Sequence, residues 1–334
     1  ELDAMPDGRW SAEDHLDNDG ITDAPLKLSA AVEIRAGRMV VDFEGSAPAC
    51  DGPLNIALPT TVAAVYVAIK HVFPDLPANA GVMRPIEVRV PEGSILAARF
   101  PAPTGGYTET ILRLIDVIFA ALAEAAPDRV VANAYGTINA LSLAGKRSDG
   151  RPWVMFSFFG GGHGGSAESD GLNHGNAPIS TATIPPLEIL EAAYPVLFRT
   201  WALRPDSAGP GMHRGGLGAI YEVEVLAEGG AEATLFGERG LFAPQGIAGG
   251  DAAAKNAFAY SADGAWHAPP MASKMRGTRL SQGEAVRLET PGGGGYGPPT
   301  DRAPAAIARD VARGLLTEGE ADRRYRPDWR GSAS

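Results

Sequence analysis

The segment from Gly160 to Asn176 holds the densest group of side chains able to do acid–base chemistry. His163 and His174 lie there among glycines, directly after an apolar run. Histidine titrates near neutral pH without help, so we predict that one of the two transfers a proton. Because glycines let backbone N–H groups approach a ligand, we also predict substrate-binding roles for Gly161, Gly162, Asp170, Asn173 and Asn176. A solvated surface loop is the alternative interpretation.

A second candidate segment, residues 204–216, combines Arg204 and Arg214 with glycine and proline. A guanidinium in such a loop can hold a carboxylate or phosphate through two hydrogen bonds, and we predict that Arg214 binds substrate in this way. The alternative is that the arginines bond backbone carbonyls and hold the loops in place.

A third candidate lies where the glycine-rich turn at residues 103–106 leads into an amphipathic helix. We expect Thr108 to cap this helix and its apolar face to run from Ile111 to Leu122. Unpaired N–H groups and the positive dipole end at such a start favour a negatively charged ligand atom. The turn therefore predicts a substrate pocket framed by Gly105, Gly106, Tyr107 and Glu109.

Common nucleotide and metal signatures fail in this sequence. Gly160 to Gly165 fits G-x-G-x-x-G, but the glycines and asparagines that follow would break the helix that a dinucleotide turn must open. The phosphate-binding loop G-x-x-x-x-G-K-[ST] is absent, as are H-E-x-x-H and C-x-x-C. Residues 17–20, Asp-Asn-Asp-Gly, resemble part of a calcium loop, but His15 and Leu26 would then stand at its first and last ligand positions, where carboxylates are needed. We therefore interpret residues 17–20 as an Asx turn. We predict no nucleotide site and no metal ligands in this chain.

Composition narrows the class of protein. The 334 residues carry 29 Lys and Arg against 40 Asp and Glu, a net charge of −11, which disfavours nucleic acid and anionic membranes as partners. Cys50 is the only cysteine, so no intramolecular disulfide can form and we expect a cytoplasmic protein. The apolar stretches are too short to span a membrane. The 42 glycines and 27 prolines predict many turns that join short strands.

The elements that must position these residues follow from hydrophobic periodicity. Residues 26–35 and 39–43 are predicted to form a hairpin, and a helix capped by Thr60 or Thr61 is predicted from Pro59 to Pro74. The unbroken apolar run from Trp153 to Phe159 is typical of a strand covered on both faces. A short helix is expected at 187–193.

The second half of the chain is predicted to be mostly β. Strands are expected at 219–226, 233–236 and 285–289, followed by helices at 301–313 and 317–325. The expected fold class is α+β. We expect a mixed part at 1–193 with the pocket loops, a β-rich part at 194–300 and a helical tail at 301–334.

A set of short motifs runs in order along most of the chain. They are, with their residue numbers, Pro-Asp-Gly (6–8), Asp-Phe-Glu-Gly-Ser (42–46), Gly-Pro-Leu-Asn (52–55), Pro-Ala-Asn-Ala-Gly (77–81), Leu-Arg-Pro-Asp-Ser (203–207), Arg-Gly-Gly-Leu-Gly (214–218) and Thr-Pro-Gly-Gly-Gly-Gly-Tyr-Gly (290–297). In order and spacing the sequence resembles the B-type subunits of the hydantoinase/5-oxoprolinase family.

The resemblance implies a division of labour. An A-type partner subunit with an actin-like ATPase fold would handle ATP and Mg and phosphorylate a cyclic amide such as hydantoin, N-methylhydantoin or 5-oxoproline. The B-type subunit would complete hydrolysis of this small molecule within a hetero-oligomer. A subunit of an ATP-dependent acetone or acetophenone carboxylase, or a non-catalytic scaffold for the ATPase, are the alternatives.

The resemblance also implies that an N-terminal part of the B-type subunit precedes the region seen here. That missing N-terminal part would be a further partner of this chain and would hold any divalent metal. Family members commonly have Gly-Gly-Asn where this sequence has Gly105-Gly106-Tyr107. Since a phenol and an amide offer different donors and acceptors, this departure bears on the identity of the substrate.

Overall fold

The computed structural model describes residues 1–176, 178–180 and 185–332. Within them it has five α-helices and thirteen strands in three open sheets, which confirms the predicted α+β class. Five short 3-10 helices lie at Leu2–Ala4, Ala80–Met83, Pro127–Arg129, Pro299–Asp301 and Pro327–Ser332. None of the helices in these residues is both long and apolar enough to cross a membrane.

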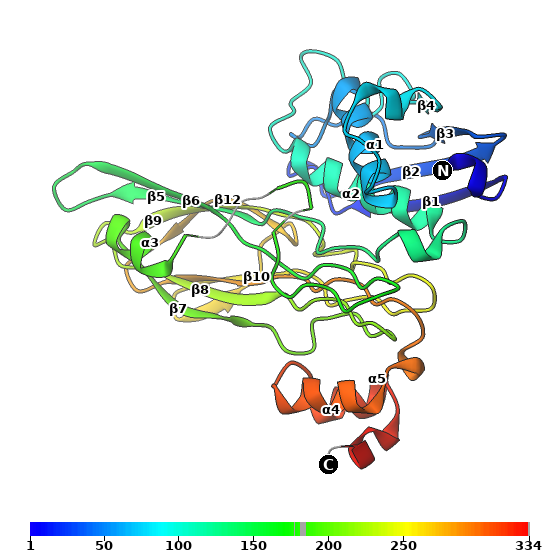
Figure 1. Ribbon diagram of the computed structural model, residues 1–334. Coiled ribbons are helices and arrows are strands. Elements are labelled where there is room, and N and C mark those ends of the chain that lie inside the picture. The colour runs from blue at the N-terminus through cyan, green and yellow to red at the C-terminus, as the bar shows by residue number, and fades with distance from the viewer. Residues whose placement is uncertain (177, 181–184, 333–334) are drawn as a thin grey trace.

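The N-terminal layer is a four-stranded sheet covered by two helices (Figure 1). Its strands are β1 (Gly8–Leu16), β2 (Leu26–Arg35), β3 (Arg38–Asp42) and β4 (Ile86–Arg89) in that order, antiparallel except for the β3–β4 pair. The predicted hairpin is confirmed, since β2 and β3 pair through the turn at Ala36-Gly37. Helix α2 (Tyr107–Leu122) packs on β1 and β2, and α1 (Leu58–Val72) packs on α2.

Both predicted helices form, but their predicted caps are wrong. Helix α1 begins after Ala57, and the Thr61 hydroxyl donates instead to the carbonyl of Leu96 at 2.5 Å. Helix α2 begins after Gly106, so Thr108 lies inside its first turn. A buried carbonyl thus takes the Thr61 hydroxyl away from its own helix, because a carbonyl inside the protein needs a donor.

Two sheets form a sandwich below this layer (Figure 1). One has the order β11-β10-β13-β8-β7 and the other the order β12-β9-β5-β6. The strands are β5 (Ala140–Lys146), β6 (Pro152–Phe158), β7 (Val196–Leu203), β8 (Ala219–Val225), β9 (Ala231–Phe236), β10 (Ala257–Ala262), β11 (Ala265–His267), β12 (Lys274–Leu280) and β13 (Ala285–Glu289). A second hydrophobic core fills the space between the two sheets.

Strand β6 differs from its prediction, and its inward side chains belong to the second core. Its side chains alternate, with Trp153 and Met155 in the core and Val154, Phe156 and Phe158 exposed, so the strand is covered on one face only. Because β5 pairs with β9 on one side and with β6 on the other, residues 140–158 complete the sandwich. The second core therefore begins at Leu141, whereas the first is built from residues 16–132 together with Ile247 and Tyr296.

The glycine-rich segments pack side by side as extended backbone, and we call them the glycine layer: residues 160–165, 171–175, 207–218 and 290–297. Gly162 N donates to Pro291 O at 3.0 Å, Gly216 N to His163 O at 2.7 Å and Gly293 N to Gly216 O at 3.0 Å. A Cβ atom added at Gly162 would lie 1.9 Å from Gly216 O. Only glycine fits here because the neighbouring backbones occupy the side-chain positions.

Three helices complete the described chain. Helix α3 (Leu187–Ala193) forms as predicted beside the sandwich. The C-terminal tail carries α4 (Pro304–Ala312) and α5 (Glu318–Arg324), far from the N-terminal layer in Figure 1. The Thr317 side chain accepts a hydrogen bond from Glu320 N, so the predicted cap of the second tail helix is confirmed.

Candidate functional site

A buried group of charges joins the N-terminal layer to the sandwich. Arg239, in the loop after β9, donates to Asp14 of β1 at 2.7 Å and to Asp116 of α2 at 2.6 Å. Arg113 of α2 also donates to Asp14, at 3.1 Å. Burial alone would raise the pKa of Asp14, but the charges of Arg239 and Arg113 lower it. Burial raises the pKa of Asp116 to about 6.

A second buried acid–base group lies next to these charges. Lys274 Nζ donates to Glu238 Oε1 at 2.6 Å, and Glu238 Oε2 accepts from Asp17 N at 2.6 Å. Glu109 Oε1 accepts from Ile138 N at 3.1 Å, whereas Glu109 Oε2 is buried without a hydrogen-bond partner. Burial, and then the negative charge of Glu238, raise the pKa of Glu109 to about 8. Glu109 is therefore mostly a neutral acid at pH 7.

A cavity of about 400 Å³, which we call the junction cavity, opens beside this group. The N-terminal layer and the loop after β3 contribute Asp19, Gly20, Ile21 and Pro53, and the sandwich contributes Thr234, Leu235, Phe236, Pro270, Met271, Lys274, Met275 and Arg276. The Lys274 ammonium lies 5.4 Å from the centre of the Phe236 ring. The cavity is thus mostly apolar, with one buried cation held by a carboxylate.

The predicted pocket residues at the start of α2 lie behind one wall of this cavity. An added Cβ at Gly106 would meet the Phe236 ring at 2.6 Å, so the turn packs directly on a lining residue. Tyr107 is exposed and Gly105 lies beside Pro53.

The Asx-turn interpretation of residues 17–20 is confirmed, because Asp19 Oδ1 accepts from Ile21 N at 2.8 Å and from Thr22 N at 2.6 Å.

The predicted residues of the glycine segment lie elsewhere, inside the glycine layer. The N–H groups of Gly161 and Gly162 donate to Gly175 O and Pro291 O, so in this structure both are taken by protein carbonyls and not offered to a ligand. His163 Nε2 lies 2.6 Å from Asn176 O, and burial lowers the pKa of His163. The segment is therefore packed backbone and not the flexible or solvated loop that the sequence suggested.

His174 lies on the far side of the same layer. Its backbone has a φ of 49°, its Nε2 hydrogen-bonds the Tyr221 hydroxyl, and its ring lies 5.9 Å from that of Trp201. Burial lowers the pKa of His174. Asn176 lines a separate cavity of about 290 Å³ with Phe156 and Phe158. Neither histidine is among the residues that line the junction cavity.

Arg214, Asp170 and Asn173 form a network that holds loops to the C-terminal tail. Arg214 donates to Asp310 at 3.1 Å and to Asn173 at 3.1 Å. Arg302 donates to Asp170 at 2.7 and 2.8 Å and to Asp310 at 2.7 Å. The Arg214 guanidinium is therefore bonded to protein groups and holds its loop in place, as in the alternative interpretation of residues 204–216.

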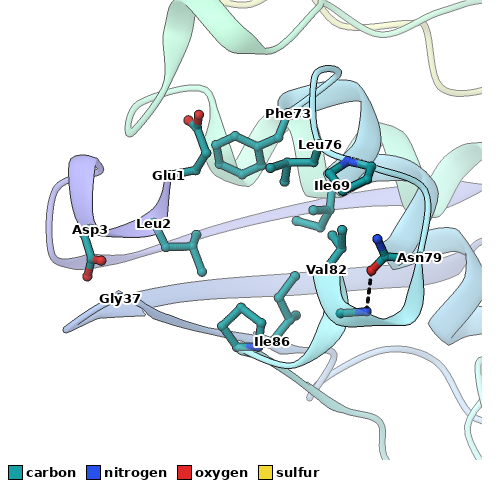
Figure 2. A pocket seen from close by; sticks show the side chains of 13 residues that line it. Glu1, Leu2, Asp3, Gly37, Ile69, Phe73, Leu76, Asn79, Val82 and Ile86 are labelled. Carbon is teal, nitrogen blue, oxygen red and sulfur yellow. Dashed lines mark hydrogen bonds between the residues drawn. The ribbon is translucent and has the colours of Figure 1, made fainter.

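An apolar cavity of about 370 Å³ lies near Glu1 (Figure 2). Ile69, Phe73 and Leu76 form one side of it and Leu2 lies opposite. It holds none of the residues predicted from sequence to bind substrate. Across residues 1–176, 178–180 and 185–332, no three His, Cys, Asp or Glu side chains are grouped as metal ligands.

Sequence reasoning missed Lys274, which lines the junction cavity, and its ion-pair partner Glu238. One signal was present in the sequence: Glu238-Arg239 stands between Gly237 and Gly240 directly after an apolar strand. Glycines on both sides of a charged pair indicate a turn, and a turn directly after a buried strand places the two charges beside the core. Lys274 carries no comparable signal.

Comparison with known proteins places the chain in a family. Residues 1–299 match the family model described as Hydantoinase B/oxoprolinase. The chain therefore belongs to the hydantoinase B/oxoprolinase family, as the motifs predicted. It is 34% identical to an uncharacterised protein of Methanocaldococcus jannaschii over 306 residues, which cover 91% of this chain and 53% of that protein.

Two further relatives carry informative names. The chain is 28% identical to the putative B-type subunit of a D-/L-hydantoinase from Pseudomonas sp. (strain NS671), over 95% of this chain and 55% of that protein. The crystal structure of ATP-dependent caprolactamase from Pseudomonas jessenii superposes with a TM-score of 0.85 and 27% identity, covering 97% of this chain and 57% of that one. The chain thus spans about half the length of these relatives.

Proposed function

We propose that this chain is part of the B-type subunit of an ATP-dependent cyclic-amide hydrolase. An A-type partner subunit would phosphorylate the amide oxygen, and this chain would hold the activated amide during attack by water. The names of two relatives support the reaction class, one belonging to a hydantoinase and the other to an ATP-dependent caprolactamase. The single observation that carries the proposal to this chain is the junction cavity with Lys274 in its wall.

The walls of the cavity suit a small ring that bears an anionic group. Its volume of about 400 Å³ is in the range of small-molecule sites. Phe236, Met271 and Met275 offer apolar surface to a ring, while the Lys274 ammonium attracts a phosphoryl or carboxylate oxygen. Glu238 holds the ammonium in place through the 2.6 Å ion pair.

Water adds to the carbon of the phosphorylated amide, the electron pair of the C=N bond moves to nitrogen, and the C–N bond then breaks to leave an acyl phosphate that a further water hydrolyses. The phosphoryl oxygens carry negative charge throughout. A fixed cation stabilises that charge without reorganising, and this is the role that we propose for Lys274. The neutral state of Glu109 matters here, because an ionised Glu109 beside Glu238 would add negative charge behind the ammonium. His163 and His174 remain our proposed proton carriers, although neither lines this cavity.

The test replaces Lys274 in the complete complex. We expect Lys274→Met to lower kcat/KM for ATP-dependent hydrolysis of hydantoin or 5-oxoproline by about 100-fold or more, in the range of a lost oxyanion donor. Lys255→Met, at an exposed lysine, is the matched control and should stay within about twofold of the parent. Product formation and ATP consumption are both measured, and folding is checked by circular dichroism.

Other outcomes would point to other functions. A folded Lys274→Met variant that retains more than a third of the activity would exclude the proposed role of this lysine. A parent complex that fixes bicarbonate onto acetone or acetophenone, and hydrolyses no amide, would favour the carboxylase. Full activity despite substitutions throughout the cavity would favour the non-catalytic scaffold.

A further inference from the structure

The outer face of β6 exposes large apolar side chains. Val154, Phe156 and Phe158 have exposed fractions of 56%, 59% and 40%. The two phenylalanine rings lie edge to face with their centres 5.0 Å apart. We call these three side chains the aromatic face. A strand face turned to solvent normally carries polar residues, so three consecutive apolar positions indicate a surface that something covers.

The aromatic face continues across the sheet toward the junction cavity. Phe158 is opposite Ala140, which is opposite Phe236 on β9. Phe156 is opposite Ser142, which is opposite Thr234. These residues share one face of the sheet, and the row ends at Thr234 and Phe236, two residues of the cavity wall. Because β6 and β9 are two strands apart, the distance between them is about 10 Å.

The outer face of the other sheet of the sandwich carries charged side chains, as solvent-facing strands normally do. They include Glu222, Glu224 and Arg287, and Arg199 bonds Glu224 at 2.6 Å. The outer positions of β6 carry no charge at all, in a chain with a net charge of −11. Farther along the same sheet, Glu232 of β9 lies opposite Arg279 of β12, so the uncharged stretch is confined to the β6 side. The contrast between the outer positions of β6 and those of β8 and β13 argues against chance exposure.

We propose that the aromatic face is covered by the polypeptide that supplies the other half of the family's full-length chains. The chain spans 53–57% of the length of the three relatives described above, so a body of similar size accompanies this fold there. The apolar residues on both faces of β6 are typical of a strand buried on both sides, and this cover supplies the second side.

The cover also comes close to the junction cavity. A polypeptide seated on Phe156 and Phe158 is two strands from Thr234 and Phe236, which line that cavity. Aromatic side chains at the centre of the contact are the residue types that interfaces favour. The inference concerns assembly and holds whether or not the reaction proposed above is correct.

The test measures the accessibility of the face in the assembled protein. In a Cys50→Ser background, Phe156→Cys places a thiol on the aromatic face, and Glu222→Cys places a control thiol on the other sheet. Maleimide labelling rates are compared for the chain alone and for the chain co-expressed with the polypeptide that its relatives carry outside the matched half. We expect at least tenfold slower labelling at position 156 on assembly and less than twofold change at position 222.

Equal labelling rates at position 156 in the free and assembled chains would overturn the proposal. So would a free chain that light scattering shows to be a dimer with position 156 already protected, because a second copy would then be the occupant. Phe156→Glu provides a second readout. It should reduce co-purification of the two polypeptides at least tenfold while the melting temperature of the free chain stays unchanged, and undiminished co-purification would contradict the proposal.

Discussion

Glu109 lies on α2 with one carboxylate oxygen bonded to Ile138 N and the other inside the protein without a partner. Water would stabilise the ionised carboxylate of Glu109, but the protein interior around it offers no such solvation. The nearby Glu238, which is already paired with Lys274, makes a second negative charge still less favourable. The protein therefore stores a proton on Glu109 at neutral pH.

This raised pKa makes stability depend on pH in a defined direction. The pKa of Glu109 is about 8 in the folded chain against an ordinary value of 4.5, so its favourable contribution is complete below about pH 4.5 and is lost as pH rises to about 8. We expect the parent to lose about 1.4 kcal/mol per pH unit from this group across that window. Glu109→Gln should remove this share of the slope in urea unfolding at pH 5, 6, 7 and 8.

The control for this prediction is Glu124→Gln, at an exposed position just beyond α2. It should show the same pH slope as the parent. A Glu109→Gln variant whose unfolding free energy falls with pH as steeply as that of the parent would show that Glu109 does not titrate in this window.

At the scale of elements, hydrogen bonds between backbone groups join the segments of the glycine layer. Segments that are far apart in sequence approach so closely that any side chain would overlap a carbonyl. At Gly215, for example, a Cβ would lie 1.8 Å from Gly293 O. Hydrogen bonds between the segments satisfy the buried N–H groups, as a sheet ladder would. The runs of glycine are thus a packing requirement of this layer.

Gly162→Ala tests this packing requirement. Its Cβ would lie 1.9 Å from Gly216 O, so backbone must move and we expect a loss of about 3 kcal/mol or more in unfolding free energy. Gly229→Ala is the matched control, because nothing lies within 4 Å of its added Cβ, and it should change stability by about 1 kcal/mol at most. Equal unfolding midpoints for the two variants would contradict this account.

At the scale of the whole molecule, the C-terminal tail is attached through buried ions. Arg302 and Asp310 are almost fully buried, and they reach Asp170 in the loop after β6 and Arg214 in the glycine layer. Loss of one member leaves the opposite charges buried with fewer partners. The tail, which lies beyond the residues matched by the family model, is therefore an integral part of this fold.

Arg302→Met should destabilise the chain by about 3 kcal/mol, measured by urea unfolding, and should make the tail more sensitive to proteolysis. Arg309→Met, at an exposed position of α4, should leave both properties close to those of the parent. The same midpoint and the same cleavage rate in both variants would mean that the ion network does not hold the tail.

The parts of this molecule that could be predicted from sequence are those set by neighbouring residues. The hairpin of β2 and β3, helices α1 and α2 and the Thr317 cap follow from local periodicity and turn chemistry. The candidate site depends on partners that no local pattern connects. Arg239 and Asp14, for example, are 225 positions apart. Which loop charges meet is decided by the tertiary fold, and so the sequence placed the pocket in glycine loops and overlooked Lys274.

The glycine layer also determines the order in which parts of the chain can fold during synthesis. Gly162 N donates to Pro291 O and Gly165 N to Gly294 O, so these two bonds must wait until nearly the whole polypeptide has left the ribosome. The first sheet and its two helices, most of whose contacts lie within residues 8–132, can assemble much earlier. A nascent chain halted before residue 290 would carry a folded first layer, but the N–H groups of Gly162 and Gly165 would lack their partners. Quality-control proteases can reach backbone that is left unpaired in this way.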